Sequence, residues 1–66
     1  MKPEAFYLLR HLPPKTLGDG VIAQAFSTNV EPSLDALRKQ HPDWFQSPGF
    51  YSLMRATGET LTVEAN

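Results

Sequence analysis

The side chains best suited to chemistry are the two histidines, His11 and His41. Asp43 follows His41 by two residues and would place one carboxylate near one imidazole. A metal site would need further ligands at close spacing, such as a second histidine one helical turn away or paired cysteines. General acid–base catalysis would need a partnered nucleophile or a carboxylate pair. The chain has neither pattern, so we expect both histidines to be surface or boundary residues.

The hydroxyl side chains give no stronger indication of catalysis. The serines do not lie in the strand–turn–helix context that exposes a nucleophile in hydrolases. A domain this small also has difficulty enclosing the ~300 Å³ that small-molecule pockets usually need. We therefore predict a protein that is not an enzyme and that has no catalytic residues, metal ion or cofactor.

Residues 1–66 are predicted to form a single domain with a small core. A chain of 66 residues buries only about 60% of the surface that its unfolded form exposes, and the absence of cysteine leaves no disulfide to compensate. Hydrophobic residues make up 41% and charged residues 20%, which is unlike the composition of disordered chains. The six prolines are spread between short runs and separate predicted elements.

Composition and charge also limit the setting and the partners. A chain without cysteine is unlike a secreted disulfide scaffold, and its N-terminus lacks the features of a signal peptide. No apolar stretch reaches the roughly 18 residues that span a bilayer. We expect a cytoplasmic protein without membrane contact. The net charge of −1 lacks the basic excess typical of nucleic-acid-binding proteins, so direct nucleic-acid binding is not expected.

Two strands are predicted in the first half of the chain. Residues 4–12 are rich in aromatic and leucine side chains and end at two successive prolines, which favours a strand over a helix. After a loop at 13–20, residues 21–28 combine β-branched side chains with a helix-favouring Ala-Gln-Ala sequence. We interpret this run as a strand antiparallel to the first. The alternative is a short helix capped by Asp19.

Residues 31–40 have the pattern of a short helix. Pro32 suits the first turn, where its missing N–H costs nothing, and basic residues in the last turn agree with the helix dipole. Leu34 and Leu37 lie on one face. Pro42 disfavours helical angles in the residue before it, so we expect the helix to end near position 40.

The last third of the chain is predicted to be a hairpin of strands 50–56 and 60–64 joined by a Thr-Gly turn. An even-numbered turn places the apolar residues of the second strand on the face of Phe50. An odd-numbered turn would match them with Arg55, whose burial is costly, so we prefer the even turn.

These elements predict an α+β fold of two layers in the order strand, strand, helix, strand, strand. One short helix packs on one face of an antiparallel sheet of three to four strands. The other face of the sheet is then uncovered.

An exposed apolar patch is predicted on that uncovered face. If Phe50 faces the helix, then Tyr51 and Leu53 point away from it, because successive side chains of a strand alternate. Tyr7 and Leu9 join them if the other side chains of the first strand point inward. Such a patch would need a partner protein or a second copy of the chain to cover it.

Three further residues complete the predicted protein-binding set. Trp44 lies in a proline-flanked turn and would be a good interface anchor, although a domain this small also recruits such aromatic residues, Phe50 included, into its core. The acidic residues of the hairpin would steer a partner electrostatically. The predicted protein-binding residues are Tyr7, Trp44, Tyr51, Leu53, Glu59 and Glu64.

A second hypothesis uses the basic residues. Arg38, Lys39 and Arg55 would form a local patch of a small nucleic-acid-binding regulator. The neighbouring Glu59 and Glu64 oppose this interpretation, and the basic helix end is also explained by the helix dipole.

No motif in the chain assigns it to a family. In size and character over its whole length, as a cysteine-free, mildly acidic α+β domain without catalytic residues, it resembles the small proteins that phages and mobile elements encode to disarm host machinery. Anti-CRISPR proteins and inhibitors of host polymerase are examples. The resemblance implies an inhibitor or adaptor that occludes the surface of a larger protein or nucleoprotein complex. A homodimer through the open sheet or an edge strand is also compatible with the pattern.

Overall fold

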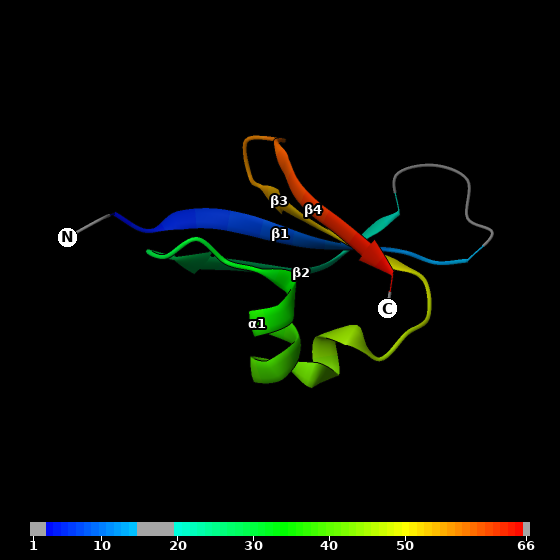
Figure 1. The fold of residues 1–66 in the computed structure, drawn as a ribbon. Helices are drawn as coiled ribbons and strands as arrows, with labels where there is room; N and C mark the ends of the chain where they lie inside the picture. Colours follow the sequence, from blue (N-terminus) through cyan, green and yellow to red (C-terminus); the bar gives the residue numbers. More distant parts are fainter. Residues whose placement is uncertain (1–2, 15–19, 66) are drawn as a thin grey trace.

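The fold is a four-stranded antiparallel sheet with a helical layer on one face. A computed structural model describes residues 3–14 and 20–65. The strands are β1 (Ala5–Leu12), β2 (Val21–Thr28), β3 (Phe50–Arg55) and β4 (Thr60–Ala65), in the spatial order β2-β1-β3-β4. The helix α1 (Leu34–Gln40) and the 3-10 helix η1 (Pro42–Phe45) lie together on one side of the sheet (Figure 1). The predicted α+β class and element order are confirmed.

The first two strands pair as predicted. Tyr7 lies opposite Phe26 and Leu8 opposite Ala25 in an antiparallel register, with an irregularity beside Leu9 and Arg10. Pairing with β1 therefore outweighs the helix propensity of the Ala-Gln-Ala sequence, as tertiary context often does. Residues 15–19 of the predicted loop, including the alternative helix cap Asp19, lie outside the described residues.

The helix ends where it was predicted to end and begins later. Ser33 is its N-cap: the side-chain oxygen accepts a hydrogen bond from the backbone N–H of Ala36 at 3.2 Å. Caps of this kind contribute about 1 kcal/mol, which explains why Pro32 precedes the helix instead of lying in its first turn. At the other end, the backbone N–H of His41 donates to the Leu37 carbonyl at 2.7 Å, and Pro42 starts η1.

The core lies between the helical layer and the sheet, on the face that the sequence interpretation had left open. Tyr7 is 4%, Leu9 0%, Tyr51 1% and Leu53 0% exposed. The predicted exposed patch is therefore wrong: these four side chains form the sheet's half of the core. The complete buried hydrophobic cluster is Tyr7, Leu9, Leu34, Leu37, Phe45, Tyr51 and Leu53.

The hairpin confirms one part of the predicted register. Val63 lies opposite Ser52 and so shares a face with Phe50, as expected from an even turn. An irregularity between Leu53 and Met54 shifts the pairing by one residue. As a result Leu61 packs against the core cluster, on the other face from the one predicted.

Candidate functional site

The candidate site is the open face of the sheet, defined by the outward side chains of all four strands. In β1, the residues that alternate with buried Tyr7 and Leu9 point to this face. Residues directly opposite one another across paired strands share a face, so the register extends it over β2, β3 and β4. Its main side chains are Phe6, Leu8, Arg10, Ile22, Phe50, Met54 and Val63.

Four large apolar side chains on the open face are more than half exposed. Phe6 is 68%, Ile22 60%, Phe50 53% and Val63 52% accessible to solvent. They come from four different strands, and the helical layer lies on the other side of the sheet (Figure 1). Scattered exposed apolar residues are ordinary, but a group on one sheet face is typical of an interaction surface.

Arg10 lies in the middle of this apolar face. It is opposite Ile22 on β2 and opposite the buried Ser52 on β3. Its Nη1 lies 3.8 Å from the sulfur of Met54, and among the described residues no carboxylate pairs with it. The open face therefore has a charged centre inside an apolar ring.

The two tyrosines predicted to bind a partner are instead anchored in the core. The Tyr51 hydroxyl donates to the Ser47 carbonyl at 3.0 Å, and the Tyr7 hydroxyl oxygen accepts a hydrogen bond from Arg55 at 3.3 Å. Buried hydroxyls need such partners. Tyr7, Tyr51 and Leu53 have too little exposed surface to form a docking patch.

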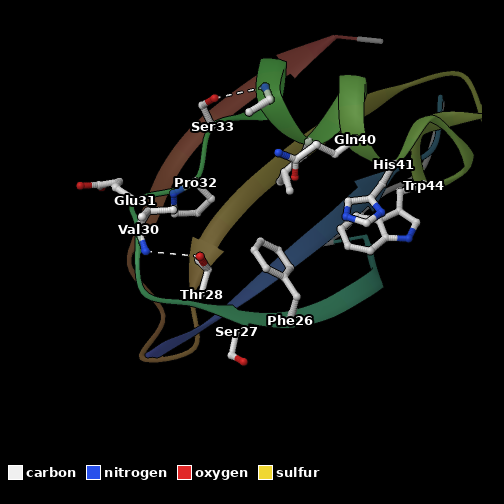
Figure 2. A pocket seen from close by; sticks show the side chains of 12 residues that line it. Phe26, Ser27, Thr28, Val30, Glu31, Pro32, Ser33, Gln40, His41 and Trp44 are labelled. Atoms are coloured by element: carbon white, nitrogen blue, oxygen red, sulfur yellow. Dashed lines mark hydrogen bonds between the residues drawn. The ribbon is translucent and has the colours of Figure 1, made fainter. Parts of the chain in front are cut away.

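Trp44 is partly buried and forms one wall of a groove between β2 and the helical layer. Its ring stacks on His41, with centroids 3.9 Å apart and an interplanar angle of 7°, and lies 5.8 Å from the Phe26 ring. Figure 2 shows Phe26 rising from β2 beneath these two rings, with Pro32 and Val30 at the other end of the groove. The core role weighed for Trp44 is thus partly realised, whereas Phe50 is exposed.

The groove has a volume of about 270 Å³ and a mixed lining. Two of its polar groups already serve the fold: the Thr28 hydroxyl oxygen accepts from the Val30 N–H at 3.3 Å, and Ser33 caps the helix. Remaining apolar surface comes from Phe26, Trp44 and the helix. Gln40 and His41 also line the groove, and His41 already stacks on Trp44. The groove is therefore a mixed recess separate from the open face.

The charged residues of the hairpin and helix neutralise one another. Arg38 pairs with Glu64 at 3.0 Å, and Arg55 pairs with Glu59 at 3.1 Å and Glu31 at 3.3 Å. Both predicted steering carboxylates, Glu59 and Glu64, are thus engaged within the chain. The same ion pairs reduce the positive charge that the basic-patch hypothesis requires.

Both histidines contact aromatic rings. His11 stacks on Tyr51 at 4.8 Å, and its Nε2–H donates to the Pro48 carbonyl at 2.8 Å. Within residues 3–14 and 20–65, no group of three or more histidine, aspartate or glutamate side chains is placed to hold a metal ion. His41 and Asp43 do not form a hydrogen bond or ion pair in this described part of the chain.

Comparisons of the chain with models of protein families, with curated proteins and with solved structures find no match. None of the helices in the described ranges has both the length and the apolar character needed to cross a bilayer. The interpretation of the site therefore depends on its geometry alone.

The residues that sequence reasoning missed are Phe6, Ile22, Phe50 and Val63. Both alternating stripes of β1 are apolar, so alternation alone does not say which one is buried. The position of Arg10 could have identified the exposed stripe. Arg10 shares a stripe with Phe6 and lies in mid-strand, where burial beneath a helix would leave its charge unpaired.

Proposed function

We propose that the protein is a non-enzymatic protein-binding module that inhibits or adapts a larger protein or nucleoprotein complex by covering part of its surface. The open face makes the contact. The observation that carries this proposal is the group of four large apolar side chains, each more than half exposed, on the sheet face opposite the helical layer. Transferring such side chains out of water stabilises an interface by about 25 cal/mol per Å² of apolar surface.

A protein partner fits this face better than nucleic acid does. The chain has a net charge of −1, and Arg38 and Arg55 already pair with carboxylates of the chain. Nucleic-acid binding draws most of its affinity from phosphate contacts by free basic residues. In the described part of the chain, the open face offers one arginine for such contacts. Action in the cytoplasm, suggested by the cysteine-free composition, is part of the same proposal.

The test is affinity capture from lysate of the source or host cells with three matched baits. The wild-type protein is compared with Phe50→Ser, on the open face, and with Val30→Ser, which removes an apolar side chain that is 66% exposed outside the sheet. Truncating an aromatic anchor of an interface typically costs 2 kcal/mol or more, about 30-fold in affinity. We expect one complex to be recovered by wild type and Val30→Ser and lost with Phe50→Ser.

Two results would overturn the proposal. One is the absence of any protein whose recovery depends on Phe50. The other is an equal loss with Val30→Ser, which would show that general surface hydrophobicity, or the groove that Val30 lines, retains proteins on the bait rather than the open face.

A further inference from the structure

Arg10 differs from the other described arginines in its electrostatic partners. Arg38 pairs with Glu64 and Asp35, and Arg55 pairs with Glu31 and Glu59. Arg10 contacts the Met54 sulfur at 3.8 Å, and a thioether is only a weak acceptor. Within residues 3–14 and 20–65, its guanidinium therefore has no strong acceptor.

Covering the open face removes that water. A guanidinium that is buried without an acceptor is strongly unfavourable, and Arg10 is half-buried already, between Ile22 and Ser52 in the register. A partner surface that covers Phe50 and Ile22 also covers Arg10, which lies between them. That surface must therefore supply hydrogen-bond acceptors for the Arg10 guanidinium. A carboxylate fits best, because its two oxygens match the planar fork of the guanidinium.

A second copy of this chain does not satisfy both requirements. With a two-fold axis at Arg10, the apolar residues overlap but Arg10 meets Arg10, a like-charge contact. Among the described residues, Glu4 is an acidic residue at the start of the same stripe as Arg10, and it accepts a hydrogen bond from the Ser27 hydroxyl at 3.3 Å. Pairing Arg10 with Glu4 of a second copy moves the axis toward the start of β1.

That displaced axis leaves apolar surface uncovered. Phe50 lies opposite Leu12, at the far end of β1. A two-fold rotation that places Arg10 of one copy opposite Glu4 of the other also places Leu12 opposite position 2 of the other copy. That position lies before Ala5, where β1 begins. Phe50 would then overhang the second copy, so a homodimer meets either the charge requirement or the apolar one.

We infer that the partner is a different protein that presents an aspartate or glutamate side chain within an apolar surface, and that this carboxylate pairs with Arg10. The inference rests on the proposed function and adds the chemistry of the partner's contact. A phosphate would also fit a guanidinium, but the apolar side chains that surround Arg10 match a protein surface.

The test uses a library of random peptides displayed on phage, selected on the immobilised full-length protein. Wild type, Arg10→Met, Arg10→Glu and Phe50→Ser serve as parallel targets, and Lys39→Met removes an exposed cation of α1 as a control. Circular dichroism establishes that each variant is folded. Removing one partner of a desolvated charge pair costs about 30-fold or more in affinity.

We expect peptides selected on wild type to combine an acidic residue with apolar ones and to lose at least 30-fold in affinity for Arg10→Met. Lys39→Met should bind them normally, and Arg10→Glu should select basic peptides. The inference would be overturned if the selected peptides were not enriched in acidic residues, or if they bound Arg10→Met as tightly as wild type. Either result would leave the open face as a binding surface.

Peptides that bind Phe50→Ser as well as wild type would instead count against the open face and the proposed function itself. Analytical ultracentrifugation of the wild-type protein measures whether it forms a dimer. A dimer that Phe50→Ser dissociates would identify a second copy as the occupant and overturn the inference of an acidic partner.

Discussion

Arg55 lies directly opposite Tyr7 across β1 and β3, and its guanidinium donates a hydrogen bond to the Tyr7 hydroxyl oxygen at 3.3 Å. The guanidinium carbon is 5.6 Å from the centroid of the Tyr7 ring. Glu31 and Glu59 pair with the same guanidinium. Arg55, at the end of the face that the helical layer covers, thus has several hydrogen-bond acceptors. This explains how that face can form the core although it carries an arginine.

Replacing Tyr7 by phenylalanine should have a small effect. The ring and its packing remain, the hydroxyl is lost, and Arg55 keeps two carboxylate partners. We expect a loss of about 0.5–1.5 kcal/mol in the free energy of unfolding, the usual contribution of one hydrogen bond. Urea denaturation measures it. A loss of several kcal/mol would mean that the hydroxyl, rather than the two glutamates, keeps Arg55 at this position.

Two neighbouring positions on opposite faces test the location of the core. Leu53 is fully buried and Val63 is 52% exposed, on adjacent strands of the hairpin. Leu53→Ala should lower the free energy of unfolding by about 2–5 kcal/mol because it leaves a cavity. Val63→Ala should change it by about 0.5 kcal/mol or less, as most exposed substitutions do. Equal losses in urea denaturation would contradict the assignment of faces.

Two glycines with positive φ offer a matched pair. Gly49 has φ 125° and Gly58 has φ 109°. A Cβ at Gly49 would lie 2.4 Å from the Leu12 carbonyl oxygen, whereas one at Gly58 would meet nothing within 4 Å. Gly58→Ala should therefore cost only the backbone strain, about 1–3 kcal/mol. Gly49→Ala should cost more, because the start of β3 must also move away from β1.

Thermal unfolding of the two variants checks this order. If Gly58→Ala were the more destabilising exchange, the close approach of Gly49 to the end of β1 would not be important for stability.

The order of elements could be predicted because local signals agree along the chain. Prolines and glycines separate the runs, and α1 ends at Gln40, two residues before Pro42. The identity of the buried face could not be predicted from alternation, since Phe6 and Leu8 are as apolar as Tyr7 and Leu9. The start of the helix also required tertiary information, namely that Ser33 rather than an earlier residue caps it.

The choice between the two faces depends on which arginine acquires carboxylate partners. Arg10 is in mid-strand and Arg55 is at a strand end, where Glu59 follows within the turn and Glu31 approaches from the segment before α1. The contact with Glu31 joins residues far apart in sequence and is invisible to local reasoning. The groove beside Trp44 is equally non-local, because it depends on the packing of η1 against β2.

The open face makes a final prediction about the free protein. Phe6 and Phe50 lie at opposite ends of β1 in the register, and each is more than half exposed. Replacing both with serine should reduce binding of an environment-sensitive hydrophobic dye to the folded protein several-fold, because the largest apolar side chains of the face are removed. The stability losses should be small and additive, since neither ring belongs to the core cluster.

Val30→Ser is the control for this experiment, because Val30 is as exposed as Phe6 but lies outside the sheet, at the end of the groove away from Trp44 (Figure 2). Dye fluorescence with Val30→Ser should stay near the wild-type value. If the double variant bound dye as strongly as wild type while remaining folded, the dye would be reporting the groove beside Trp44 instead. The Trp44→Phe variant separates these sites, because it changes a wall of the groove on the other side of the sheet and leaves the open face intact.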